Sequence, residues 1–381
     1  MSSVEEEFRR LAERFRPLFA QIADGESERE RGGIPPREQL QLLIDAGFAG
    51  LRVPRDLGGE GARLSTVLRL ISELAVADVN LAHIWRNHVS FLEDRLAGRD
   101  DPRSDEWLRR LGRGEIIGGG WSEPGTGTPG ISTHLVATEG GWLLSGVKYY
   151  TTGSIYADWA TVLALEPDGT QVVALVNTSA PGVTIGDDWD GFGQRLTGSG
   201  SVTYENVHVP TENVFRYEAR YVYQLQFYQS TLNALLVGIA NALVRDGAAA
   251  LRARGRSHPN ALSPAPADDP ELLEVLGRVS AHAWAAESAF LASLDALDAD
   301  LESSDDDWSA SRLATYRTQL VVTQNVLDAA SAVFDALGSS GTSASFALDR
   351  HWRNARTIAS HNPRVYVARI VGDAAVNGRL P

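Results

Sequence analysis

The spacing of apolar residues along the chain changes twice, and it predicts helix in the first part. Near the N-terminus apolar side chains recur at steps of three and four, the spacing of one buried helix face. These positions are Val4, Phe8, Leu11, Phe15, Leu18 and Ile22. Pro35–Pro36 and the Gly-rich stretch 58–61 then divide the zone into several helices. Residues 1–117 are therefore predicted to form an N-terminal helical domain.

The second part alternates between apolar and polar positions, as strands do. Residues 134–138 and 142–151 are joined by a Glu-Gly-Gly turn, and residues 159–165 and 171–176 by a Pro-Asp-Gly turn. Residues 201–209 alternate again. Successive antiparallel hairpins without an intervening helical pattern predict a small β-barrel or sandwich over residues 118–214.

The third part returns to helical spacing, and a C-terminal bundle is predicted over residues 215–381. The long periodic segments are residues 232–254, 270–302, 308–337 and 345–376. Asp305–Asp307 precede the third segment, where acidic residues serve as caps and partners of the helix dipole. His83 and His88 stand five apart rather than four, so no helical metal pair is expected. The whole order predicts an α+β protein.

Composition narrows the classes of partner. The 381 residues contain 35 basic and 49 acidic side chains, for a net charge of −14, which argues against nucleic acid or an anionic membrane. There is no cysteine, so disulfides and thiolate chemistry are excluded. The start lacks the basic and apolar order of a secretion signal, and no apolar run approaches ~20 residues. A cytoplasmic location is expected.

A glycine-rich segment, residues 125–130, matches the pattern G-x-G-x-x-G. A dinucleotide fingerprint needs a strand before it and a helix after it, whereas here Pro129 and a strand-like run follow, so that interpretation fails. The preceding residues, Ser122–Gly127, would expose backbone N–H groups beside the Ser122 hydroxyl. They form either a tight entry loop or a cradle for the carbonyl edge of a flavin ring.

Three further segments carry candidate chemistry. Residues 148–154 include Tyr150 and Thr152, and residues 187–195 include Trp189. Each combines aromatic and hydroxyl groups that suit a flat cofactor but also suit an ordinary strand or turn. His361 lies just before Pro363, which fits the first turn of the last helix. An imidazole there either moves protons near neutral pH or packs at a helix junction.

Together these segments resemble the acyl-CoA dehydrogenase superfamily over essentially the whole chain. The resemblance implies an N-terminal helical domain, a central β-barrel and a C-terminal four-helix bundle. Ser122–Glu123–Pro124 looks like its flavin loop, and Lys148–Thr152 like its flavin-stacking strand with Tyr150 in the aromatic place. Gly338–Gly341 resembles its glycine-rich turn, and Arg254 (or Arg256) the arginine that reaches a neighbouring subunit's cofactor.

One departure bears on the reaction. Where straight-chain acyl-CoA dehydrogenases carry a catalytic glutamate, the matching position here is Asn362. An amide is not basic and cannot abstract an α-proton. An FAD-dependent acyl-CoA dehydrogenase or oxidase with its base elsewhere remains the alternative. A flavoprotein scaffold without catalysis is a third hypothesis.

A narrower group fits better, because residues 351–357 and 360–363 are very similar to the C-terminal signature of dibenzothiophene monooxygenase and related sulfur-compound flavin monooxygenases. That resemblance implies reduced FMN from a separate reductase, O2, and a C4a-(hydro)peroxyflavin that oxygenates sulfur, nitrogen or an aromatic carbon. It implies a homotetramer as well.

The same resemblance assigns roles to single residues. His361 is the proton-handling group, Thr152 the hydroxyl near flavin N5, and Tyr150 and Trp189 the flanking aromatics. His88 is a weaker substrate-facing candidate. The remaining expected cofactor-binding residues are Ser122, Arg254, Gly338, Gly341 and Asn362.

Overall fold

The computed structural model describes residues 3–123 and 130–380, and its N-terminal part is helical as predicted. Four residues of the predicted apolar stripe on the first helix are buried, namely Phe8, Leu11, Phe15 and Ile22. The helices are α1 (Ser3–Ala23), α2 (Glu26–Gly32), α3 (Arg37–Asp45), α4 (Leu64–Ala77), α5 (Val79–Ala97) and α6 (Pro102–Gly112).

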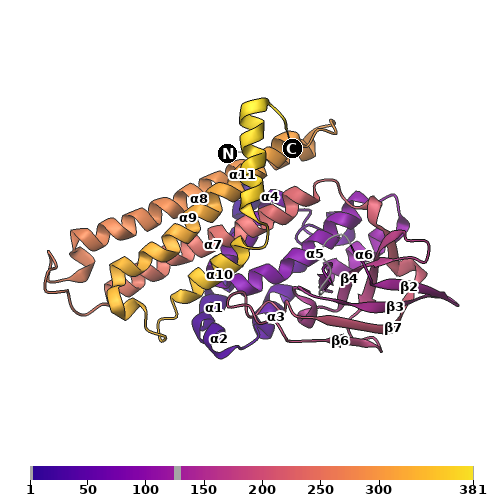
Figure 1. The fold of residues 1–381 in the computed structure, drawn as a ribbon, viewed down its shortest axis with the longest axis horizontal. Coiled ribbons are helices and arrows are strands. Elements are labelled where there is room, and N and C mark those ends of the chain that lie inside the picture. The colour runs from indigo at the N-terminus through magenta and orange to yellow at the C-terminus, as the bar shows by residue number, and fades with distance from the viewer. Residues whose placement is uncertain (1–2, 124–129, 381) are drawn as a thin grey trace.

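Helix α5 lies between the sheet on one side and α4 and α7 on the other (Figure 1). It begins after Asp78, whose carboxylate accepts a hydrogen bond from the backbone N–H of Leu81 at 3.0 Å, and it ends at Gly98. Most of its side chains are buried on all sides, including the polar residues His83 and Asn87. A buried helix can carry polar groups only where they find partners, so α5 is a natural support for a site.

The middle part folds into one eight-stranded sheet among the described residues. The strand order is β6-β7-β3-β2-β4-β5-β8, and β1 pairs in parallel with β4. The strands are β1 (Ile117–Gly120), β2 (His134–Thr138), β3 (Gly141–Lys148), β4 (Trp159–Leu165), β5 (Gln171–Asn177), β6 (Val183–Ile185), β7 (Val202–Pro210) and β8 (Val214–Arg216). Strands β1, β6 and β8 were not predicted, because they are short and β1 reads Ile-Gly-Gly-Gly without alternation.

The C-terminal part is the predicted helical bundle, with α8 and α9 running side by side away from the sheet (Figure 1). The periodic segment over 345–376 forms two helices that separate at Ser360–Pro363, consistent with the expected place of Pro363 at the start of the last helix; proline disfavours helical backbone in the residue before it. The helices are α7 (Gln224–Ala253), α8 (Pro270–Glu302), α9 (Ser309–Gly341), α10 (Asp349–Ala359) and α11 (Arg364–Asn377).

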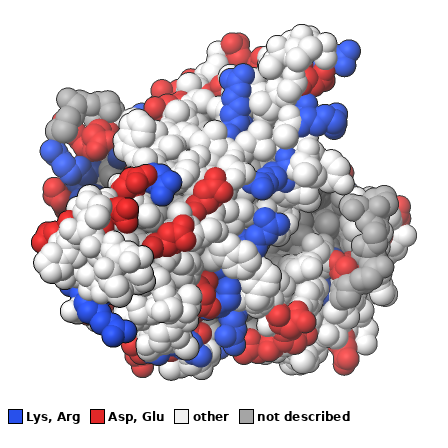
Figure 2. All heavy atoms as spheres, turned by 60° about the vertical axis from the view of Figure 1, so that its left-hand side comes forward, with Lys and Arg blue, Asp and Glu red and all other residues white. Residues whose placement is uncertain are grey.

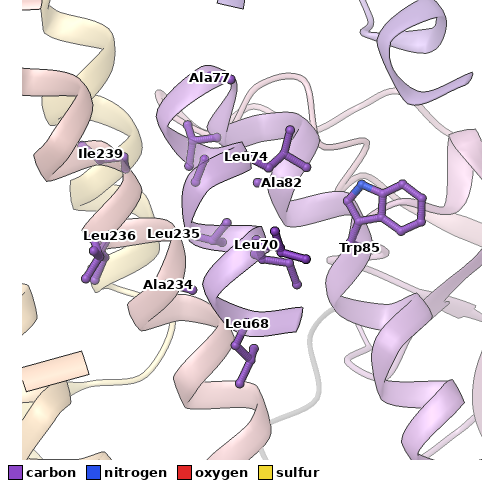
Figure 3. Packing of buried hydrophobic residues seen from close by; sticks show 14 of the residues in the cluster. Leu68, Leu70, Leu74, Ala77, Ala82, Trp85, Ala234, Leu235, Leu236 and Ile239 are labelled. Atoms are coloured by element: carbon purple, nitrogen blue, oxygen red, sulfur yellow. The ribbon is translucent and has the colours of Figure 1, made fainter. Parts of the chain in front are cut away.

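The main core joins the first and third parts, with α4 packed between α5 and α7 (Figure 3). Leu70 and Leu74 of α4 are fully buried there, as are Leu235 of α7 and Trp85 of α5. At Gly238 of α7 the two helices approach so closely that an added Cβ would lie 2.4 Å from the Cβ of Ala75. The backbone of α7 therefore touches α4 directly.

Within the part of the chain that the structure describes, two helices, α7 and α9, are long and apolar enough to span a bilayer by length and composition alone, which the absence of an uninterrupted apolar run did not indicate. In the fold, 61% of the most apolar stretch of α7 and 44% of that of α9 are buried. Most of the apolar surface of α7 is thus buried in the core, as in the central helix of a bundle.

Candidate active site

A cavity of about 460 Å³ lies where the three parts of the chain meet, and it holds five of the predicted site residues. These are Ser122, Tyr150, Thr152, Trp189 and His361. The other lining residues are His83, Gly191, Phe192, Gln194, Ser199, Thr357, Ile358 and Ser360. One face of the molecule carries interspersed acidic and basic side chains and is hollowed at one side (Figure 2). The cavity size is typical of small-molecule sites.

One wall of the cavity is aromatic. The Tyr150 ring lies edge-on to Tyr149, with centroids 4.7 Å apart, and to Trp189 at 5.8 Å. Tyr150 has a φ of 59°, which is uncommon outside glycine, and its side chain is 56% exposed. Its neighbours impose this backbone, since Tyr149 pairs with Ser122 and the Thr151 N–H donates to the Gly200 carbonyl at 3.2 Å. The fold thus holds a large ring open to the cavity.

Behind this wall runs a chain of hydrogen-bonded hydroxyls. The Thr197 hydroxyl donates to the Gln194 carbonyl at 2.8 Å, and Ser199 lies 2.7 Å from both Thr197 and Thr152. Each hydroxyl has one proton. Since the Thr197 proton is used on a carbonyl, Ser199 donates to Thr197 and Thr152 donates to Ser199. Thr152 therefore presents lone pairs, and no proton, to the cavity.

Helix α5 fixes the position of Thr152. The side-chain amide of Asn87 donates to the Thr152 carbonyl at 2.8 Å and to the Gly119 carbonyl at 3.3 Å. The next residue, Gly153, has a φ of 84°, and a Cβ there would come within 3.2 Å of the Ile84 carbonyl. A glycine is required at this turn by both backbone angle and space.

His83 lines the cavity and was not predicted to belong to it, because its spacing from His88 was considered only for metal binding. Its Nδ1 lies 2.7 Å from Gln194 Oε1, and its Nε2 has no hydrogen-bond partner within the described part of the chain. Burial, reinforced by the nearby Arg86 charge, lowers the pKa of His83 to about 3. The ring is therefore neutral and donates from Nδ1 to Gln194, which leaves the buried Nε2 as an acceptor without a partner in the described part of the chain.

His361 lies at the break between α10 and α11 and is held by its neighbours. Its Nδ1 is 3.3 Å from Asn362 Oδ1, and the Asn362 amide donates to Gln229 Oε1 at 2.9 Å. Gln319 donates to the Asn362 carbonyl at 3.0 Å. Asn362 thus fixes the orientation of the His361 ring through its Nδ1 atom. Removal of water from the ring lowers the pKa of His361, and the nearby positive charge of Arg86 adds to this effect. The part of the residue that stays exposed to water limits the shift.

At the base of the segment that begins with Ser122, a buried ion pair joins Lys148 to Glu123 at 2.6 Å. Glu123 also accepts hydrogen bonds from Ser132 and Thr133. The donors that surround this carboxylate, Lys148 first among them, hold the pKa of Glu123 well below its usual range against the effect of burial. Glu123 thus joins the two ends of the predicted flavin loop, through Ser132 and Thr133, and Lys148 ties it to β3; residues 124–129 of the loop lie outside the described residues.

Other predicted residues lie elsewhere. His88 was expected to face the substrate, and the structure corrects this, because His88 does not line the cavity. Its side chain is buried against Trp85, and its Nε2 lies 2.9 Å from the Ala49 carbonyl. Arg254, Gly338 and Gly341 gather at the far ends of α7 and α9, around two smaller hollows of about 230 and 270 Å³. Their expected contact with a neighbouring subunit's cofactor stays a prediction. No cluster that could hold a metal was found in residues 3–123 and 130–380.

Sequence comparison gives the family. The acyl-CoA dehydrogenase N-terminal domain profile matches residues 3–115, the middle domain 118–207, and the C-terminal domain 230–364. The chain belongs to the acyl-CoA dehydrogenase family. The predicted α+β architecture of helical, sheet and helical parts is confirmed.

Individual relatives narrow this assignment. Dibenzothiophene monooxygenase of Mycolicibacterium goodii is 27% identical, over 93% of this chain and 90% of its own. The probable FMNH2-dependent monooxygenase SfnC of Pseudomonas putida is 26% identical, over 96% and 94%. The crystal structure of FMN-bound TdsC from Paenibacillus sp. A11-2 superposes with a TM-score of 0.91, at 25% identity over 98% of both chains. These comparisons confirm the predicted enzyme class, a flavin-dependent monooxygenase.

Proposed function

We propose that this protein is the oxygenase of a two-component system. It takes reduced FMN from a separate reductase and transfers one oxygen atom of O2 to a sulfur, nitrogen or aromatic carbon of a small organic substrate. The observation that carries the proposal is the cavity lining: an aromatic wall, an accepting hydroxyl at Thr152 and two imidazoles, with no carboxylate among its described residues. The FMN-bound relative supports FMN over FAD.

The residues present fit a flavin. Tyr150 and Trp189 offer faces and edges for a flat ring, and Ser122 and Thr152 offer hydroxyls at its polar edge. The unpaired Nε2 of His83 is a buried polar atom that needs a partner of this kind. When bound, reduced flavin supplies the electrons that activate O2.

The protein's own contribution is proton handling and exclusion of water. Because Nδ1 of His361 faces Asn362 Oδ1, Nε2 of His361 carries the free lone pair and can take a proton at that atom. His83 offers a second accepting nitrogen. The hydrogen bonds to Gln194 and Asn362 fix which nitrogen of each ring is protonated, because an amide oxygen can only accept and so holds the ring N–H that faces it.

The alternative, an acyl-CoA dehydrogenase, needs a base strong enough to remove an α-proton. Glutamate fills that role in the straight-chain enzymes that the sequence resembles, whereas no Asp or Glu lines the cavity in the described residues. This composition favours oxygenation over dehydrogenation.

We further propose a cytoplasmic homotetramer assembled through the C-terminal helices, in which Arg254 reaches a neighbour's cofactor.

The test combines the protein with reduced FMN, ¹⁸O2 and a panel of sulfides, sulfinates, hydroxylamines and indoles. Mass spectrometry is expected to find one ¹⁸O atom in a product, with less free hydrogen peroxide than in the absence of that compound. Peroxide alone with every compound would contradict the proposal. Bleaching of bound FAD by an acyl-CoA would establish the alternative.

A further inference from the structure

Arg86 is a cation on α5 whose charge is not matched by an acid. It follows His83 by one helical turn, and its guanidinium carbon lies 4.5 Å from the centre of the Tyr228 ring on α7. Its Nε is buried and has no hydrogen-bond partner in the described part of the chain. The side chain as a whole is only partly accessible to water.

Other arginines in this region differ in their partners: Arg95 of α5 is also buried without an ion pair among the described residues and lies over the Phe91 and Phe215 rings, whereas two others are paired. Arg220 contacts Asp94 at 3.0 Å, and Arg52 contacts Glu93 at 2.7 Å. No ion pair of Arg86 with a carboxylate is present among the described residues, and burial lowers its pKa while only the hydroxyls of Tyr228 and Tyr221 oppose this. A cation withdrawn from water without an anion is unfavourable, and one aromatic ring compensates for it only in part.

Arg86 is not among the lining residues of the cavity, but two routes through the structure place it next to residues that are or that hold them. On its own helix, residues three apart share a face, and His83 lines the cavity. On α7, Tyr228 precedes Gln229, which holds Asn362 and through it His361. The Arg86 charge acts on both histidines and lowers the pKa of each.

The sign of the local charge differs from that of the molecule. The chain carries −14 overall, yet no Asp or Glu occurs among the described lining residues. Both histidines are neutral and present lone pairs, so they cannot supply the positive charge that an anion needs. Arg86 supplies it, together with a planar set of donors that matches a carboxylate or sulfur oxyanion.

We propose that Arg86 binds the oxyanion of the substrate, so that the enzyme acts on a small organic acid carrying a carboxylate, sulfinate or sulfonate. This rests on the proposed function and names its substrate class. The anion would lie at the α5–α7 side of the cavity, with the atom to be oxygenated directed toward His361. An uncharged compound of the same shape would leave Arg86 without a partner and bind more weakly.

The experiment measures equilibrium binding to the protein saturated with oxidised FMN. The probes are benzoate, benzenesulfinate and benzenesulfonate, compared with benzyl alcohol and methyl phenyl sulfide as uncharged counterparts. At least one anion is expected to bind about tenfold more tightly than both uncharged probes. Arg86→Met is expected to remove that preference, and Arg86→Lys to retain part of it. Arg278→Met, at an exposed site on α8, is the matched control.

Two results would overturn the inference. One is equal affinity for charged and uncharged probes, or an unchanged preference in Arg86→Met with normal circular dichroism. The other is a loss of FMN affinity in Arg86→Met as large as the loss of anion affinity, which would assign the charge to the flavin. Because binding is measured without turnover, oxygenation of uncharged compounds alone would leave the proposed function standing while the inference fails. Conversely, a preference for anions without oxygenation of any compound would leave the role of Arg86 standing while the proposed function fails.

Discussion

At the residue scale, the chain of hydrogen-bonded hydroxyls behind Thr152 decides whether Thr152 donates or accepts a hydrogen bond in the cavity. Thr152 accepts, because its proton is committed through Ser199 and Thr197 to a backbone carbonyl. The N5 position of a flavin is a donor when reduced and an acceptor when oxidised. A fixed acceptor therefore favours the reduced state, which agrees with the proposed delivery of flavin that is already reduced.

This argument predicts the behaviour of Ser199→Ala. Without Ser199 the Thr152 proton is free to turn toward the cavity, so the preference for reduced over oxidised FMN should fall about fivefold, the worth of one ordinary hydrogen bond. Anaerobic fluorescence titration of both flavin states measures the ratio. Thr184→Val, at an exposed position on β6, is the control. An unchanged ratio in Ser199→Ala would show that the chain does not set the polarity of Thr152.

His361 gives a second prediction at this scale. Its lowered pKa keeps the ring neutral and able to take a proton at neutral pH, and this ability is lost only as pH falls through a value below the ordinary ~6.5 of histidine. His361→Ala should slow oxygenation about a hundredfold or more and remove the acid limb of the pH–rate profile, with FMN affinity unchanged. Rapid-quench kinetics from pH 4 to 8 measures both. Wild-type turnover in the variant would take His361 out of the mechanism.

At the scale of the elements, the contact between α4 and α7 depends on one glycine. Gly238→Ala would place a Cβ 2.4 Å from that of Ala75 and 2.7 Å from the Ser72 carbonyl. The helices must separate, at a cost of about 1–3 kcal/mol in the free energy of unfolding.

Gly277 on α8 provides the matched control, since an added Cβ there meets nothing within 4 Å. Gly277→Ala should leave stability unchanged or raise it by up to about 1 kcal/mol through helix propensity. Urea denaturation followed by circular dichroism compares the two variants. Equal stability would show that α4 and α7 can move apart freely.

At the scale of the whole molecule, the C-terminal helices expose large apolar side chains. Trp284 of α8 is 71% exposed, and Val365 and Tyr366 of α11 are 69% and 65% exposed. Helix α11 rises steeply out of the bundle (Figure 1). Surfaces of this kind mark contacts between chains.

The predicted homotetramer should therefore show a mass near four times 41.2 kDa in light scattering after size exclusion. Trp284→Arg is expected to shift the protein to smaller species, because it buries a charge in the contact. Val136→Arg, at an exposed position on β2 of the sheet, should not. A monomeric wild-type protein would contradict the assembly, and with it the role expected for Arg254.

The sequence predicted the order of helical and strand-rich parts because their periodicity is long and regular. The prediction failed where an element was short, or where residues meet only through tertiary contacts. Strand β1 has three glycines and no alternation, so it was missed, whereas Pro363 correctly indicated where the last helix begins. At the site, aromatic and hydroxyl motifs indicated Tyr150, Thr152 and Trp189, whereas His83 and Gln194 carry no local pattern. They meet only because α5 packs against the loop between β6 and β7.

That meeting has a consequence for how the protein can change over generations. Gln194 is tied to His83 of the first part by its side chain and to Asn354 of the third by its backbone N–H at 2.5 Å. The backbone N–H persists whatever side chain stands at 194, whereas exchange of His83 or Gln194 alone strands a polar group in the interior. Lineages that exchange one of these two residues are expected to exchange the other with it, so this part of the site should diverge by linked steps across distant stretches of the gene.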